Sequence, residues 1–334
     1  MTLKTKLAAY FGSSKKTTAL LAAATLTIGA LGASVAVAQS TQRLAFSGGP
    51  DGGTFQYFSN GISLHMSRNM PGVDVSNMAS AGSVENLRRV NSRDADFGIV
   101  YSGDLFLGIN GKLTNDTRQY RNTHAVAYMF GAPAHLIVLE NSGITQVSQL
   151  EGKRVAVGPA GSGAAASAQR FFESLGMWDK ISPQYIGYTQ GASAIGDRQI
   201  DALWVFAGFP NASVIQAATS NRVRLLQVYE AAQTGNLFEV HPYYAQVTIP
   251  AGTYTGVNYD VVTIQDSALW VAGRHISEDL MYEAMQKVYS DEGLAFMRTV
   301  SAAAAAMTVE NGVLGIVTDL HDGADKFWRE KGIK

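Results

Sequence analysis

The sequence contains no cysteine and little charge for its length. The absence of cysteine excludes disulfides, thiolate zinc sites and cysteine nucleophiles. Charged residues make up 16% of the 334 residues and the formal net charge is −1, which argues against a dedicated nucleic-acid or anionic-membrane partner. Hydrophobic residues make up 46%, so the chain can bury a large core, and its length suffices for two compact lobes.

Familiar catalytic motifs are missing too. The histidines are scattered, without an i,i+4 pair or an H-E-x-x-H motif, and no G-x-S-x-G elbow is present. His135, within PAHLIV, is interpreted as a hydrogen-bonded structural residue, and Glu85 and Asp104 as helix caps or solvated carboxylates. No set of nucleophile, base and orienting group emerges. We therefore predict a binding protein and not an enzyme, with no catalytic residue, metal or cofactor.

The first 38 residues have the pattern of a secretory signal. A region with lysines but no acidic residue precedes the apolar run ALLAAATLTIGALGASVAVA, which ends in Ala36-Val37-Ala38. The alternative is a membrane anchor, because the run has about the ~20 residues that a spanning helix needs. Its small residues favour cleavage near Ala38. We expect residues 1–38 to be removed and a soluble, periplasmic protein to remain.

The remaining chain alternates strand-like and helix-like segments. Apolar residues at helical spacing (Phe55, Phe58, Ile62, Met66) follow the first strand, and Pro71 ends that helix. The expected strands are 44–46, 73–78, 96–101, 135–140, 154–158 and 201–206, and strand character returns after residue 245 in VTIPAGTY and VVTIQDSALWVAG. This β-α-β order predicts an α/β fold in which mainly parallel sheets are flanked by helices.

An internal similarity indicates two lobes of similar build. The segment NSRDADFGIVYSG (91–103) matches GDRQIDALWVFAG (196–208), and the spacing of Gly48 and Gly53 recurs at Gly158 and Gly163. With two chain crossings, near 132 and near 246, we expect one lobe of residues 39–132 plus 247–334 and another of 133–246. A ligand cleft is expected between them.

Two glycine-rich loops, GGPDGGT and GPAGSGA, each connect a predicted strand to a helix. Their spacing is that of a P-loop, but no lysine follows Gly53 or Gly163, so a nucleoside triphosphate site is not predicted. The GSGAAA segment also fits a weak dinucleotide pattern, which is unexpected in an exported protein. Helix N-termini present free N–H groups and a favourable dipole to a carboxylate. The alternative is that the glycines only form tight turns.

Five ordered segments carry a family resemblance: GGPDGGTFQYF, ASAGSVENLRRVNSRDADFGIVYSGD, LEGKRVAVGPAGSG, AGFPNASV and YYAQVTIPAGTYTG. From about residue 43 to the C-terminus, the chain resembles the TAXI family, solute receptors of the tripartite ATP-independent periplasmic (TRAP) transporters. The resemblance implies a two-lobed, type II-like periplasmic-binding-protein fold. It also implies delivery of a small organic acid, such as glutamate or a related dicarboxylate, to a sodium-driven membrane permease.

The resemblance also implies a set of ligand-binding residues from both lobes. These are Gly53, Thr54, Phe55, Ser80, Ser83, Asn86, Tyr101, Ser102, Ser162, Gly163, Ala164, Phe209 and Pro210. Two departures from the family, Ala164–Ala166 after GSG and Tyr101 in place of glutamine, make the pocket less polar on one side. We therefore expect a carboxylate with an apolar or aromatic tail.

The counter-charge of the ligand is not evident in these loops. Arg88 and Arg89 follow one of them and are expected to face solvent or a neighbouring element. A buried dianion without a partner is costly, so either the acid is a monocarboxylate or an arginine from elsewhere reaches in. The first alternative to a TRAP receptor is the binding subunit of another importer, such as an ABC-type one, or of a sensor. An enzyme of the same architecture is the second alternative. We expect a monomer.

Overall fold

The computed structural model describes residues 41–114 and 116–334, so the predicted signal sequence lies outside the described residues. The strands are β1 Gln42–Ser47, β2 Val73–Met78, β3 Phe97–Tyr101, β4 Thr123–Leu139, β5 Arg154–Ala156, β6 Ser182–Gln184, β7 Ala202–Phe206, β8 Val223–Leu225, β9 Ala245–Ile249 and β10 Val261–Gly273. The α-helices are α1 Thr54–Asn69, α2 Ser83–Ser92, α3 Ser102–Ile109, α4 Gly163–Ser174, α5 Tyr188–Gly196, α6 Ala212–Ser220, α7 Tyr229–Thr234, α8 Leu237–Val240, α9 Glu278–Val288, α10 Asp291–Val300 and α11 Asp322–Glu330.

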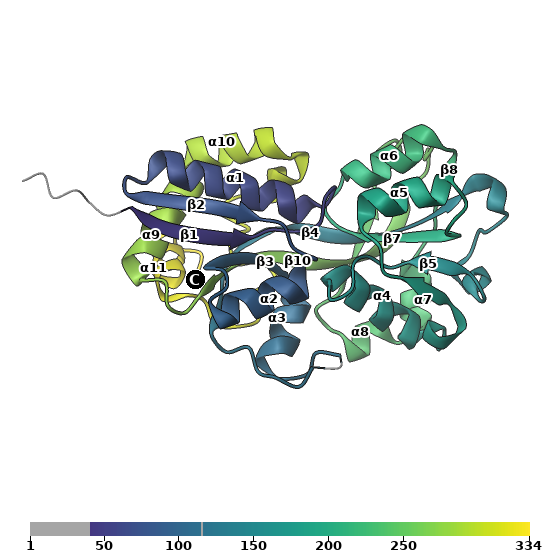
Figure 1. Ribbon diagram of the computed structural model, residues 1–334, viewed down its shortest axis with the longest axis horizontal. Helices are drawn as coiled ribbons and strands as arrows, with labels where there is room; N and C mark the ends of the chain where they lie inside the picture. The colour runs from purple at the N-terminus through teal and green to yellow at the C-terminus, as the bar shows by residue number, and fades with distance from the viewer. Residues whose placement is uncertain (1–40, 115) are drawn as a thin grey trace, which may run out of the picture. The chain divides into compact units, whose positions relative to one another are not determined.

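The strands follow the order β2-β1-β3-β10-β4-β7-β5-β6, with β8 beside β4 and β9 beside β10. Strands β2-β1-β3 are parallel and carry helices α1–α3; we call this part the first lobe. Strands β7-β5-β6 are also parallel and carry α4–α6; we call it the second lobe. Figure 1 shows helices on both faces of the sheet in each lobe. The predicted two-lobed α/β fold is confirmed.

Two long strands, antiparallel to each other, connect the lobes. Strand β4 pairs with β10 up to Pro133 and with β7 from Ala134 onward. Strand β10 pairs with β9 over Val261–Gln265 and then with β4. The expected crossing near 132 therefore falls where β4 changes partner, whereas the expected crossing near 246 falls within β9.

Helix α1 shows how the apolar spacing produces the core. Phe58, Ile62 and Met66 recur every four residues and are fully buried on one face of the helix. The helix ends at Asn69, two residues before Pro71. It packs against β2, and the C-terminal helices α9 and α10 pack against α1 in turn.

The internal similarity of the sequence is a structural repeat. Arg93 and Arg198, at equivalent positions after α2 and α5, both adopt left-handed backbone conformations, with φ of 67° and 57°. Asp96 accepts the N–H of Ala45 at 2.7 Å, and its equivalent Asp201 accepts the N–H of Arg154 at 2.9 Å. Each lobe thus ties its first strand to its third with the same side chain.

Several elements were not among the expected segments: β6, β8, α3, α7, α8 and α10. Helix α3 follows β3 without a loop and contains two glycines, Gly103 and Gly108, which weaken a helical pattern in sequence. Within 41–114 and 116–334, the helices are too short or too polar for any of them to span a membrane.

Candidate ligand site

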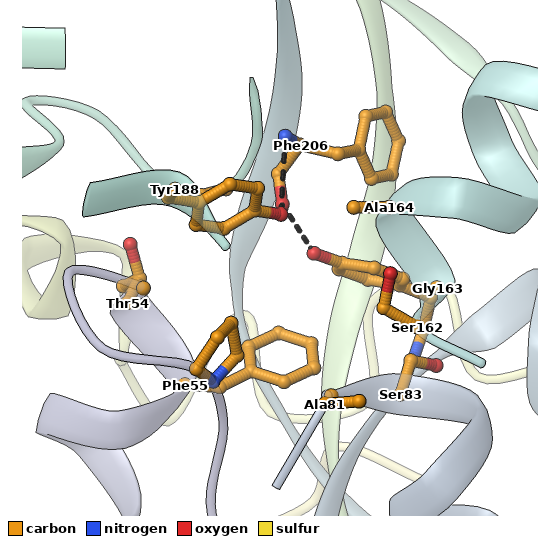
Figure 2. A pocket seen from close by; sticks show the side chains of 14 residues that line it. Thr54, Phe55, Ala81, Ser83, Ser162, Gly163, Ala164, Tyr188 and Phe206 are labelled. Carbon is orange, nitrogen blue, oxygen red and sulfur yellow. Dashed lines mark hydrogen bonds between the residues drawn. The ribbon is translucent and has the colours of Figure 1, made fainter. Parts of the chain in front are cut away.

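A small cavity lies where the two lobes meet (Figure 2). It is lined by Pro50, Gly53, Thr54, Phe55, Ala81, Gly82, Ser83, Tyr101, Ser162, Gly163, Ala164, Tyr188, Phe206 and Ala207. None of these residues carries a charge. The cavity volume is about 10 Å³, which is about the space of one water molecule. A larger guest therefore requires the walls to separate.

The structure brings eight of the predicted site residues together around this cavity. They are Gly53, Thr54, Phe55, Ser83, Tyr101, Ser162, Gly163 and Ala164. They come from loops that are far apart in the sequence and lie at the starts of α1, α2 and α4 and at the end of β3. In Figure 2, Thr54 and Phe55 lie on one side, and Ser162, Gly163 and Ala164 on another.

Three predicted residues from the first lobe do not line the cavity. The amide of Asn86 donates to the carbonyls of Gly48 and Ile99, and its oxygen accepts from Ser80 at 2.7 Å. Asn86 and Ser80 therefore hold the first glycine loop against α2. Ser102 donates to the carbonyl of Gly315.

The remaining two predicted residues, Phe209 and Pro210, are joined by a cis peptide bond and lie just beyond the cavity wall. They follow Phe206 and Ala207, which do line it. In this segment the structure therefore places the wall a few residues earlier than the family resemblance implied.

Six lining residues were missed by the sequence analysis: Pro50, Ala81, Gly82, Tyr188, Phe206 and Ala207. The internal repeat contained a signal for three of them. Ser83, Tyr101 and Ser102 in the first lobe correspond, 105 residues later, to Tyr188, Phe206 and Ala207. Extending the alignment to the site would have identified these residues.

Three helices point their N-termini toward the cavity. Residues that precede or begin α1, α2 and α4 form much of its wall. The Ser162 side chain caps α4 by accepting from the N–H of Ala165 at 3.0 Å, whereas Gly53 caps α1 without a side chain. The first N–H groups of a helix have no intrahelical partner, and the helix dipole places partial positive charge there. The wall is suited to a negative group.

Two hydroxyl groups of the wall, those of Thr54 and Tyr101, bind across the interface between the lobes. Tyr101 donates its hydroxyl to the carbonyl of Phe206, and Tyr188 donates to the same oxygen at 3.0 Å (Figure 2). Thr54 donates to the carbonyl of Gly208 at 3.3 Å. Burial raises the pKa of Tyr101 well above its usual value, so its hydroxyl stays protonated.

A buried ion pair lies behind the wall. Arg170 of α4 contacts Asp104 of α3 at 2.6 Å, and their side chains are 4% and 0% exposed. Arg170 also donates to the Tyr244 hydroxyl at 3.2 Å and lies 6.0 Å from the centre of the Tyr243 ring. The interpretation of Asp104 as a cap or solvated carboxylate is wrong, because the tertiary fold buries it against an arginine that is distant in sequence.

A second buried carboxyl group, Asp266 of β10, adjoins this pair. It accepts the N–H groups of Gly103 at 3.1 Å and Ser267 at 2.7 Å. Burial, and then the charge of Asp104, raise the pKa of Asp266 to about 8. Asp266 is therefore largely protonated at neutral pH.

The other residues discussed from sequence have structural roles. Arg88 pairs with Asp116, and Arg89 with Glu85. His135 is buried and bonded to the hydroxyl of Tyr254 at 2.9 Å; burial lowers its pKa to about 4. Among the described residues, histidines and carboxylates are not grouped in a way that would hold a metal ion.

Comparison with known proteins identifies the family. A profile of the NMT1-like family matches residues 46–332, and the chain belongs to this family. MatC from Rhodopseudomonas palustris, solved with bound malate, has a TM-score of 0.51 at 15% identity; the alignment covers 78% of this chain and 88% of MatC. A protein of Bordetella bronchiseptica has a TM-score of 0.50 at 14% identity, covering 88% of this chain and 99% of that one. These structures share the fold.

Proposed function

We propose that this member of the NMT1-like family is an exported solute receptor that captures a small carboxylate and delivers it to a TRAP-type importer. One observation carries the proposal. Residues from six separate segments, at the starts of α1, α2, α4 and α5 and at the ends of β3 and β7, meet around one uncharged cavity between two lobes. That arrangement suits a negative group.

We further propose that the lobes act as a clamp, with residues 39–132 plus 247–334 in one and 133–246 in the other. A ligand that contacts both lobes stabilises the closed arrangement by its difference in affinity for the two forms. The bonds of Thr54 and Tyr101 to carbonyls of the second lobe are of the kind that closure makes and opening breaks.

The side chains of the wall favour an apolar portion in the ligand. Phe55, Tyr101, Tyr188 and Phe206 supply aromatic surface, and alanines supply much of the rest. The hydroxyls of both tyrosines are bonded to the carbonyl of Phe206. A carboxylate with an apolar or aromatic tail places its charge at the helix N-termini and its tail against these rings.

Native mass spectrometry of residues 39–334, purified without denaturation, tests the receptor function. A co-purified acid, released on unfolding, supports the proposal and identifies the ligand. If the protein is bare, thermal shifts with a broad panel of carboxylates follow, and failure of every acid to stabilise it contradicts the proposal. N-terminal sequencing of the exported protein is expected to begin at Gln39.

The type of importer is tested by uptake in cells. Uptake of the identified acid should require this chain and a sodium gradient. Uptake that depends instead on ATP hydrolysis would assign the chain to another class of importer and leave its role as a receptor intact.

A further inference from the structure

An arginine does reach the back of the cavity, but the protein's own carboxylate occupies it. Arg170 makes its 2.6 Å contact with Asp104, and its other terminal nitrogen donates to Tyr244. The side chain is 4% exposed. Both terminal nitrogens of the guanidinium are therefore engaged within the protein. The helix N-termini are the groups left to attract an anion.

Asp104 lies directly behind two lining residues. Ser83 donates its hydroxyl to Asp104 at 2.6 Å, and a methyl group added to Gly163 would lie 2.6 Å from the same carboxylate oxygen. Ser83 also accepts the N–H of Tyr101 at 2.9 Å. The Ser83 proton is therefore directed away from the cavity. This part of the wall has no hydroxyl group that could donate to a second anion, and the Asp104 carboxylate lies directly behind it.

A second carboxyl group, that of Asp266, lies close to Asp104. It lies 2.8 Å from the position of a methyl group on Gly103, the residue before Asp104, and shares the buried cluster with Arg170, Tyr243 and Tyr244. The cluster thus holds two carboxyl groups and one cation. Deprotonation of Asp266 would make its net charge negative.

We infer that the site accepts acids with a single carboxylate and rejects dicarboxylates, and that Asp104 is the residue that enforces this selection. The inference rests on the proposed function of the site. Each helix N-terminus carries roughly half a positive charge, which suits one carboxylate. A second carboxylate of the ligand could not pair with Arg170, which is bound to Asp104, and would lie close to the Asp104 carboxylate. The free-energy cost of removing it from water would therefore not be compensated.

Closure of the lobes makes the selection strict. Asp104 belongs to the first lobe and Arg170 to the second, so separation of the lobes also separates the pair. When the lobes close, Asp104 pairs with Arg170 again. Because Asp104 is part of the same chain, its effective concentration is high, and a carboxylate of the ligand would have to displace it.

Calorimetric titration with matched acids tests the inference. The pairs share a carbon skeleton and differ in one carboxylate: butanoate and butanedioate, pentanoate and pentanedioate, 2-benzylbutanoate and 2-benzylbutanedioate. At about pH 7, where both carboxylates are ionised, we expect the monocarboxylate of at least one pair to bind. Its dicarboxylate partner should bind at least about tenfold more weakly.

We define the selectivity as the ratio of monocarboxylate affinity to dicarboxylate affinity within a pair. The double variant Asp104→Asn/Asp266→Asn is expected to reduce this ratio by at least about tenfold, because Arg170 then lacks an internal counter-charge. Asp116→Asn is the matched control: Asp116 is also buried and paired with arginines, but it does not line or adjoin the cavity, and its ratio should match the wild type. If the double variant does not fold, Asp104→Asn alone should still reduce the ratio of monocarboxylate to dicarboxylate affinity, because Arg170 then loses the carboxylate that it contacts at 2.6 Å.

The outcomes separate this inference from the proposed function. A wild-type protein that binds dicarboxylates as tightly as monocarboxylates overturns the selectivity and leaves the receptor function standing. An unchanged ratio in folded Asp104 variants overturns the role of Asp104. If no acid of either kind binds here or in the broader panel, the proposed function itself fails.

Discussion

The first and second lobes build opposite walls of the cavity from equivalent positions, yet the chemistry of the two walls differs. Helix α2 begins with Ser83, whose hydroxyl contacts a carboxylate, and helix α5 begins with Tyr188, whose hydroxyl contacts a backbone carbonyl. Strand β3 ends in Tyr101 and strand β7 in Phe206, and these two equivalent residues bind each other.

The buried charges are divided in the same unequal way. Asp104 and Asp266 lie on elements that pack with the first lobe, and Arg170 lies on α4 of the second. The repeated backbone positions the two walls of the cavity. The buried charges, in contrast, come from side chains that have no equivalent in the other lobe. Each prediction below alters one side of this comparison.

The largest effect is expected from Arg170→Met. The change leaves Asp104 buried without its partner and should lower the free energy of unfolding by about 3–5 kcal/mol. Urea denaturation measures the loss. Arg154→Met is the control, since the Arg154–Asp201 pair of the second lobe is 44% and 31% exposed and its loss should matter little. If both changes lowered the free energy of unfolding equally, burial of the Arg170–Asp104 pair would not explain its contribution to stability.

The raised pKa of Asp266 predicts a dependence of stability on pH. Between its ordinary pKa of 3.8 and its folded value of about 8, the folded protein holds a proton on Asp266 that the unfolded chain has released. Stability conferred by this group is therefore full below the lower value and is lost as pH rises, by up to about 1.4 kcal/mol per pH unit. Asp266→Asn should lack this component. Urea titrations of both proteins at several pH values measure the difference, and parallel profiles would refute it.

Gly163→Ala should push the lobes apart. Its new methyl group would meet Ser83, Asp104 and Tyr101 of the first lobe at 2.5–2.6 Å, so we expect a loss of about 1–3 kcal/mol in stability and weaker binding of any ligand held by the closed form. The equivalent change, Gly53→Ala, meets the carbonyl of Pro50 in its own loop at 2.9 Å. Small-angle scattering should show a larger radius of gyration for Gly163→Ala alone. A larger radius for both variants, or for neither, would contradict the prediction that Gly163 is the position that allows the lobes to approach.

The smallest effect is expected from the cap of α4. Ser162→Ala removes a side-chain cap that α1, whose N-cap is Gly53, lacks, and should cost about 1 kcal/mol. Ser277→Ala removes a similar cap from α9, away from the cavity. Thermal unfolding should show similar losses for both, and only Ser162→Ala should weaken binding of the ligand. A matched loss of affinity in both variants would show that the Ser162 cap has no particular role at the site.

The sequence was a good guide where local patterns dominate. Apolar spacing predicted α1, and the glycine-rich loops marked the starts of α1 and α4. Strand β4 was predicted only over its last residues, because Gly131 and Pro133 interrupt the pattern. Pro133 lies where β4 changes from one partner strand to the other, so the interruption marks the passage between lobes.

The charged cluster could not be predicted in the same way. Asp104 and Arg170 are 66 residues apart and belong to different lobes, so their contact depends on how the lobes meet. In sequence, Asp104 has the appearance of an acidic residue in the first turn of a helix, where carboxylates are common. Only the tertiary structure distinguishes such a residue from a buried counter-ion.

The paired strands β4 and β10 also limit how the molecule can move. Because they pair with each other from Thr123 to Pro133, with two register shifts, separating the two strands would break many hydrogen bonds, whereas twisting them together need not break any. Relative motion then has essentially one degree of freedom, a rotation about this ribbon. In the proposed clamp, wall residues at the ends of β3 and β7, which pair with β10 and β4, are expected to travel shorter arcs than the glycine-rich loops, whose preceding strands do not pair with either. We expect a solute to enter from the rim and to meet the aromatic rings of Tyr101 and Phe206 last.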